Sequence, residues 1–162
     1  MEDAFFQWTE ELIVVAHVII AALLAGVIGL ERELSGKPAG FRTNMIVGGA
    51  AALIISTGQT MMHDFAADSM IAEVMRTDPL RMIEAVVVGV SFIGAGTILK
   101  VEEKKKVQYL TTAAVVLFSA GIGMSVAIGQ YVVAVGVTVF ILFVNRTSNL
   151  VDKWISNSRK NK

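Results

Sequence analysis

The chain has 162 residues, of which 54% are hydrophobic and 17% are charged, and its mean hydropathy is +0.65. This composition is far from that of an average soluble domain and favours a single-domain membrane protein. The 14 basic and 14 acidic side chains balance, so no excess charge indicates nucleic acid as a partner. The absence of cysteine excludes disulfides, a thiolate nucleophile and cysteine-based zinc sites.

Runs of apolar residues predict five membrane-spanning helices. A bilayer core about 30 Å thick needs about 20 apolar residues in a helix. In chain order, the predicted spans cover residues 12–30, 45–62, 80–99, 110–128 and 130–148. The first run follows an acidic segment, whereas a signal peptide begins with basic residues, so we expect this run to be retained as a helix. The fifth span is the shortest, because the apolar part of it would rise only about 21 Å.

The connections between the spans carry local signals of their own. Between the second and third spans, residues 64–77 keep apolar side chains at helical spacing, which predicts a short amphipathic surface helix with Asp64 as its N-cap. Asp78 followed by Pro79 predicts the start of the third helix, because proline is favoured at the first helical position. The fifth span is rich in valine and phenylalanine, and we expect it at the periphery of the bundle.

Basic residues gather at one end of the predicted bundle. Those at the basic end are Arg32, Lys37, Arg42, Lys100, Lys104, Lys105, Lys106, Arg146, Lys153, Arg159, Lys160 and Lys162. The other end has only Arg76 and Arg81. Because cytoplasmic loops are enriched in lysine and arginine, the predicted fold is an all-α integral membrane bundle of five transmembrane helices, with the N-terminus outside and the C-terminus in the cytoplasm. The last basic cluster lies on the same side as the one before it, so the short fifth span must cross.

Small residues spaced four apart predict where the helices pack, because helices in lipid associate through close backbone approach. These sets are Ala22 with Gly26, Ala25 with Gly29, Gly48 with Ala52, Ala85 with Gly89, Ser91 with Ala95, and Ser119 with Gly123 and Ala127. Gly94 and Gly96 predict either a tight crossing point for the first helix, which we favour, or a broken helix around a polar cavity. The predicted helix-packing motif is Gly26, Gly29, Gly89, Gly94 and Gly96.

Three motifs resemble the MgtC/SapB family. The first reads Gly26-Val-Ile-Gly29-Leu-Glu31-Arg32-Glu33, followed by Lys37-Pro-Ala-Gly40-Phe-Arg42-Thr43. The second, Gly89-Val-Ser-Phe-Ile-Gly94-Ala-Gly96, is similar to that family's GIGFLGAG signature, and the third, Leu110-Thr-Thr-Ala-Ala114, is similar to its LTTAA-type motif. Ser91 and Tyr109 stand where the family usually has glycine. Many members also carry a cytoplasmic C-terminal domain, and we expect this chain to be a short form without the functions of that domain.

The resemblance implies a multi-pass bacterial inner-membrane protein linked to magnesium homeostasis and to stress or virulence adaptation. It implies a modulator whose partners are the lipid bilayer, other membrane proteins and a second copy of the chain. A small magnesium or proton transporter or channel, with a pore between subunits, is the open alternative. The acidic residues gather at the helix ends instead of at mid-membrane, which favours the modulator. No nucleophile with a base, metal triad or cofactor loop is present, so we expect neither an enzyme nor a cofactor.

The candidate site lies at the basic end of the bundle. Glu31, Arg32, Arg42, Thr43 and Thr112 predict a polar cluster that links three helices and forms a ligand or partner site, because ionisable groups at membrane depth tend to pair. The alternative is that these residues anchor the helix ends among lipid headgroups.

Other polar residues have weaker functional interpretations. His17, inside the first span, is either a proton relay or, as we favour, a neutral histidine that hydrogen-bonds within the bundle. Asp64 and Asp68 in the outer connection are weak candidates for Mg²⁺ ligands, since this ion prefers oxygen ligands. An ordinary acidic loop explains them equally simply. Glu84 is expected to reach the outer surface or to pair with Arg81.

Overall fold

The computed structural model describes residues 2–67, 78–99 and 109–160, and these ranges contain five helices and no strand. The helices are α1 (Glu2–Leu34), α2 (Phe41–Ala67), α4 (Pro79–Leu99), α5 (Leu110–Ala127) and α6 (Tyr131–Lys160). The prediction of an all-helical fold is therefore confirmed.

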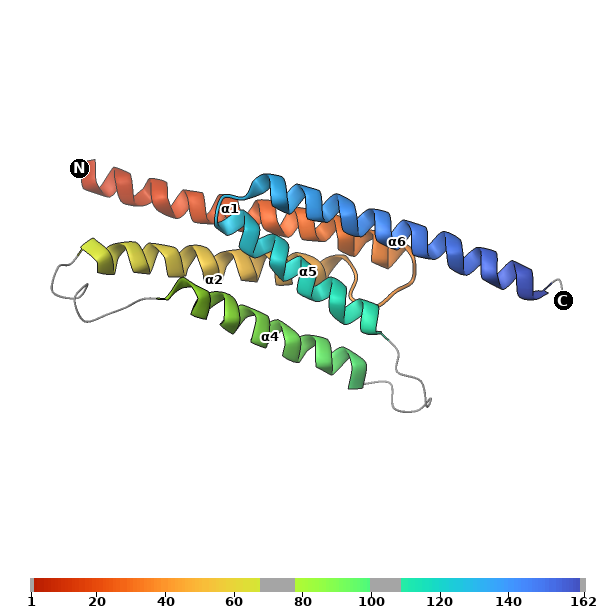
Figure 1. The fold of residues 1–162 in the computed structure, drawn as a ribbon. Coiled ribbons are helices and arrows are strands. Elements are labelled where there is room, and N and C mark those ends of the chain that lie inside the picture. Colours follow the sequence, from red (N-terminus) through yellow and green to blue (C-terminus); the bar gives the residue numbers. More distant parts are fainter. Residues whose placement is uncertain (1, 68–77, 100–108, 161–162) are drawn as a thin grey trace.

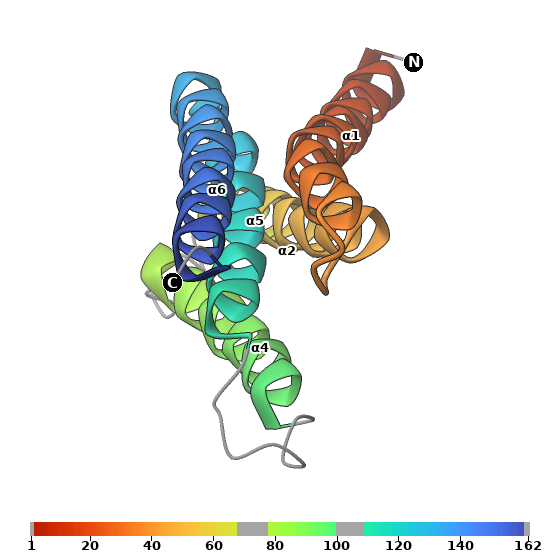
Figure 2. The same ribbon diagram turned by 90° about the vertical axis from the view of Figure 1, so that its right-hand side faces the viewer.

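The helices form a bundle around α5. Successive helices run in opposite directions, and the two chain termini lie at opposite ends of the bundle (Figure 1). α5 contacts α1, α2, α4 and α6, whereas α4 contacts only α5 and α2. Seen from one end, α1 and α4 lie on opposite sides of the bundle, with α2 and α5 between them (Figure 2). α6 contacts α5 and α1 and exposes a row of large apolar side chains, as expected for a peripheral helix.

Four helices contain segments long and apolar enough to cross a membrane. These segments are Trp8–Leu34, Phe41–His63, Pro79–Ile98 and Leu110–Ala127. The apolar part of α6, Tyr131–Thr147, is shorter, although the complete helix of 30 residues is about 45 Å long. A fifth crossing by α6 therefore stays a prediction, as does the side of the membrane on which each terminus lies.

Local sequence explains where the helices begin and end. The side chain of Asp78 accepts a hydrogen bond from the backbone N–H of Leu80 at 2.9 Å, and Pro79 is the first residue of α4, as predicted. α1 and α5 both end at a glycine in the left-handed region, Gly36 with φ +64° and Gly129 with φ +77°. At both ends the next N–H bonds back to a carbonyl of the last helical turn, which is the usual way in which glycine closes a helix.

α2 is longer than the sequence predicted. Its backbone stays helical through His63 and Asp64 to Ala67, so the separate helix expected to begin at Asp64 does not begin there. The reason is local: no glycine or proline interrupts residues 59–67, and alanine at the end of this range favours a helix. The remainder of the predicted surface helix, residues 68–77, lies outside the described residues.

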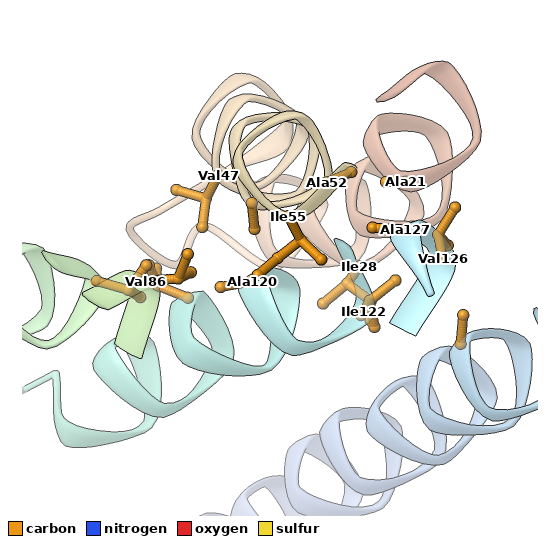
Figure 3. Close-up of a cluster of buried hydrophobic side chains, with 14 of the residues drawn as sticks. Ala21, Ile28, Val47, Ala52, Ile55, Val86, Ala120, Ile122, Val126 and Ala127 are labelled. Carbon is orange, nitrogen blue, oxygen red and sulfur yellow. The ribbon is translucent and has the colours of Figure 1, made fainter. Parts of the chain in front are cut away.

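Small side chains bring α1, α2 and α5 close together. Ala21, Ala52 and Ala120 come from these three helices and are fully buried in the apolar core shown in Figure 3. A Cβ atom added to Gly123 of α5 would collide with the carbonyl oxygen of Gly48 on α2. This close approach is the kind of contact that holds helices together in lipid.

The predicted glycines of α1 lie in this tightly packed region. A Cβ atom on Gly26 would come within 2.7 Å of the Met45 side chain. A Cβ atom on Gly29 would come within 2.6 Å of the Gly40 carbonyl oxygen. Gly29 would meet backbone atoms, so this position requires glycine for α1 to approach α2 this closely, whereas a side chain at position 26 would displace the Met45 side chain.

The glycines of α4, Gly89, Gly94 and Gly96, do not pack against the first helix, which was the prediction for Gly94 and Gly96. Gly94 faces α5, where a Cβ atom would lie 3.3 Å from the Ala113 Cβ, so it is not a crossing point for α1. α4 is also a continuous helix from Pro79 to Leu99, so Gly94 and Gly96 do not break it. At Gly89 and Gly96 a Cβ atom would meet no atom within 4 Å. These two glycines do not pack against any of the described residues, because α5 occupies the centre and α4 lies at the edge of the bundle.

Candidate functional site

Arg32 is the centre of a buried polar cluster at the end of α1, and it is only 1% exposed. Its Nε and Nη2 atoms donate to the Pro38 carbonyl oxygen at 3.3 and 3.2 Å. Nη2 also donates to the hydroxyl of Thr112 in the first turn of α5. One guanidinium group thus joins the end of α1, the turn that follows it and the start of α5.

Two carboxylates beside Arg32 bind other elements. Glu31 accepts hydrogen bonds from Asn145 Nδ2 on α6 at 2.9 Å and from the Ser35 hydroxyl at 3.0 Å. Glu33 accepts a hydrogen bond at 2.9 Å from the backbone N–H of Phe41, the first residue of α2. A negative charge at a helix N-terminus is stabilising, so Glu33 of α1 caps α2.

Asn44 connects the start of α2 to the middle of α5, and it is completely buried. Its Nδ2 atom donates to the carbonyl oxygens of Ala39 at 2.6 Å and Gly40 at 2.9 Å. Its Oδ1 atom accepts a hydrogen bond from the Ser119 hydroxyl at 2.7 Å. Ser119 also lies within hydrogen-bond distance of the carbonyl oxygen of Val115 on its own helix.

The structure brings together some of the residues of the predicted polar cluster but not all. Arg32 contacts Thr112, and Glu31 binds α6 next to them. Arg42 and Thr43 are exposed, and neither forms a hydrogen bond or ion pair within the described part of the chain. The first turn of α2 presents Asn44, not the two residues before it, to the interior of the bundle.

Asn44, Ser119 and Asn145 belong to this polar network but were not among the predicted site residues. The second span was predicted to begin at Met45, so Asn44 counted as part of the connection before it. Ser119 offered a signal, since it lies two helical turns after Thr112 and therefore on the same face of α5. The sequence gives no comparable signal for Asn145, because a polar residue just after an apolar run is typical of the membrane surface.

His17 joins three helices at the other end of the bundle. Its Nδ1 atom lies 3.3 Å from the Ser56 hydroxyl on α2, and its Nε2 atom lies 2.9 Å from the Tyr131 hydroxyl on α6. In a neutral imidazole one of these nitrogens donates and the other accepts, so both contacts can form at once. The structure therefore agrees with the favoured expectation of a histidine that hydrogen-bonds within the bundle.

The described residues contain no group of three or more His, Cys, Asp or Glu side chains that could hold a metal ion. The side chain of Asp64 and the whole of Asp68 lie outside the described residues, so the hypothesis of a Mg²⁺ site there stays a prediction. Glu84 is exposed on α4, and within the described ranges it forms no ion pair with Arg81.

Sequence comparisons connect the chain to known proteins. A sequence model of the MgtC family matches residues 18–154. An uncharacterized protein of Haemophilus influenzae is 37% identical over 146 residues, which cover 90% of this chain and 60% of that protein. The "Putative magnesium transporter YhiD" of Escherichia coli K12 is 38% identical over 130 residues, covering 80% of this chain and 58% of YhiD.

A third relative, "Protein MgtC" of Salmonella typhimurium, is 34% identical over 131 residues, covering 81% of this chain and 50% of that protein. The chain therefore spans 50–60% of the length of these relatives. No solved structure matches the chain significantly.

Proposed function

This chain belongs to the MgtC family, and from that premise we propose that it is a non-enzymatic modulator of other membrane proteins in the bacterial inner membrane. Family membership and the four long apolar helices support a multi-pass membrane protein, and the name of the Escherichia coli relative supports a magnesium-related role. The proposal adds five crossings, an outer N-terminus and a cytoplasmic C-terminus. The opposite positions of the termini in Figure 1 and the clustering of basic residues at one end support this orientation.

The observation that carries the proposal is the outward face of α4. Gly89, Phe92 and Gly96 are spaced three and four residues apart and therefore lie on one face of the helix. Phe92 is 83% exposed, and the two glycines leave open space beside it. Glycine offers lipid tails no side chain to contact, whereas a second helix can approach the backbone of a glycine closely. An exposed ring flanked by two glycines is the pattern expected of a face that receives a helix of a partner.

The buried polar groups also favour a modulator over an ion carrier. Arg32, Glu31 and Asn44 each bond to a neighbouring helix or turn and hold the bundle together. A transport path needs polar groups that exchange their partners with the passing ion. We therefore assign these residues a structural role that holds α1, α2, α5 and α6 together.

Site-specific crosslinking tests the docking face. A photoreactive phenylalanine analogue is placed at position 92 of the full chain, and the same analogue is placed at Phe140, an exposed apolar residue of α6, as the matched control. We expect discrete crosslinked products from position 92 in bacterial membranes and only diffuse lipid adducts from position 140. A product of twice the mass of the chain identifies a second copy as the partner, and other products identify other membrane proteins.

Glycine variants supply the specificity control. Gly89→Leu with Gly96→Leu fills the face, so the crosslink at position 92 should fall about fivefold or more, equivalent to about 1 kcal/mol of helix association. Gly136→Leu on α6 is the same change at another glycine with open space around it and should leave the crosslink unchanged. Identical yields in all variants would overturn the proposal.

Transport of magnesium or protons is the second candidate function. The name of the Escherichia coli relative supports it. A single chain offers no row of acidic side chains through the described bundle, so transport would require a pore between subunits. Ion flux into sealed liposomes separates the two functions.

A further inference from the structure

We propose, on the premise that α4 is a docking face as in the proposed function, that its partner is a second copy of this chain and that Arg81 of each copy pairs with Glu84 of the other. The starting observation is a pair of opposite charges near the start of α4. Arg81 and Glu84 are both exposed, and neither forms an ion pair or a side-chain hydrogen bond with any described residue.

The length of α4 places both charges inside the hydrocarbon layer that it is expected to cross. α4 has 21 residues and rises about 32 Å, which is just enough for a bilayer core about 30 Å thick. Arg81 and Glu84 are its third and sixth residues, so they lie about 3 and 8 Å below its first residue. An ionisable group at such depth is costly unless it reaches water or pairs with an opposite charge. The long Arg81 side chain can reach the surface, whereas the shorter Glu84 side chain gains most from a partner near its own depth.

The charged residues lie on the same side of α4 as the docking face. Glu84, Val88 and Phe92 are spaced four residues apart, so they follow one another along one side of the helix. Val88 is 70% exposed and Phe92 is 83% exposed. Ala85 and Gly89 beside them are exposed small residues, which let a second backbone approach closely.

A second copy is complementary to this face for a reason of symmetry. Copies inserted in one membrane share one topology, so their α4 helices run in the same direction. A two-fold axis perpendicular to the membrane then places equal residues at equal depth and makes the contact self-complementary. Arg81 of each copy lies within one helical turn of the depth of Glu84 of the other, which an arginine side chain can bridge. An unrelated helix would need both charges at the same spacing to match this face equally well.

Disulfide formation in bacterial membranes tests the contact, because the chain has no cysteine of its own. Val88→Cys introduces a single thiol on the outward side of α4. Val139→Cys, at an exposed position at a similar distance along α6, is the matched control. A disulfide needs Cβ atoms about 4 Å apart. We expect oxidation with copper phenanthroline to convert the Val88→Cys chain, and not the Val139→Cys chain, to a product of twice the chain mass.

Charge reversal decides whether Arg81 and Glu84 hold this contact. In the Val88→Cys chain, either Glu84→Arg or Arg81→Glu places like charges across the two-fold axis. Each reversal should lower the disulfide yield about fivefold or more, equivalent to about 1 kcal/mol. Co-expression of the two reversed chains, one of them carrying a size tag, should restore the disulfide between them, because one copy then supplies two positive charges and the other two negative charges. This rescue separates a contact between copies from a structural role of either residue within one chain.

The outcomes separate the second copy from the docking face itself. A yield unchanged by both reversals, or no rescue on co-expression, would overturn the proposal. If a reversed chain does not insert, Glu84→Gln removes the charge at nearly the same shape and should also lower the yield, and an unchanged yield in that variant would count against the pair. Photocrosslinks from position 92 to other membrane proteins, without a disulfide at position 88, would overturn the second copy but leave α4 as a docking face. Absence of both products would contradict the docking face as well.

Discussion

Replacing Asn44 with alanine should destabilise the bundle more than any other single loss of a polar side chain in its centre, apart from Arg32. Asn44 is completely buried and makes three hydrogen bonds, two to carbonyl oxygens before α2 and one from Ser119 on α5. Hydrogen bonds between helices in membranes average about 0.6 kcal/mol and reach about 1.7. We therefore expect Asn44→Ala to lower the free energy of unfolding by about 2–4 kcal/mol.

Replacing Ser119, which donates to Asn44, should lower the free energy of unfolding less than replacing Asn44 does. Ser119→Ala removes one hydrogen bond between helices and leaves both bonds from Asn44 Nδ2 in place. Its expected cost is about 1 kcal/mol. Thr43→Ala, an exposed polar change one residue before Asn44, should cost less than about 0.5 kcal/mol and serves as the control.

A double-mutant cycle measures the bond between the two residues. Unfolding is followed by circular dichroism while sodium dodecyl sulfate is titrated into mixed micelles. The double variant should be more stable than the sum of the single losses implies, with a coupling of about 0.6–1.7 kcal/mol. Strict additivity, or a loss below about 0.5 kcal/mol for Asn44→Ala, would refute the reasoning.

Three further predictions follow from the same structure. Gly123→Ala should cost about 1–3 kcal/mol in unfolding titrations because its Cβ would collide with the α2 backbone, whereas Gly121→Ala, with no atom near its Cβ, should be neutral or slightly stabilising. Tyr109→Gly should raise the free energy of unfolding by about 1 kcal/mol, because φ 71° is costly for any residue except glycine. In this cysteine-free chain, an impermeant maleimide should label Gln130→Cys in intact cells but Lys162→Cys only after permeabilisation, and external labelling of both would contradict a fifth crossing.

Hydropathy and local signals predicted most of the fold. The apolar runs gave the helices, and Asp78 with Pro79 gave the start of α4. The end of α2 was wrong because acidic residues near a helix end resemble an N-cap, and only the continuous backbone shows that the helix goes on to Ala67. Composition also cannot tell which helix is central: the first span is more apolar than α5, yet it is α5 that contacts all the others.

The candidate site was predicted only in part. Arg32 and Thr112 are polar residues at the same end of two spans, so a contact between them could be expected. Arg42 lies outside the polar cluster because of the direction in which the first turn of α2 faces. That direction is set by packing against α1 and α5. The outward position of Gly89 and Gly96 was likewise unpredictable, because glycine spacing shows that a helix can be approached but not by which neighbour.

The backbone conformation at Tyr109 explains one difference between this chain and the family pattern. Tyr109 stands where the family usually has glycine, and the structure places it in the left-handed region that glycine adopts without strain. The backbone at the start of α5 thus keeps a conformation suited to glycine even with a bulky residue. This is why the Tyr109→Gly variant is expected to stabilise the chain.

The central claim, that the chain modulates membrane partners instead of carrying ions, is tested most directly by ion flux. Purified chain is reconstituted into sealed liposomes with magnesium and proton indicators, and its helical content is verified by circular dichroism. We predict no flux above that of empty liposomes. Magnesium or proton uptake that disappears in Glu31→Gln would contradict the claim and would make the polar cluster around Arg32 part of a transport path.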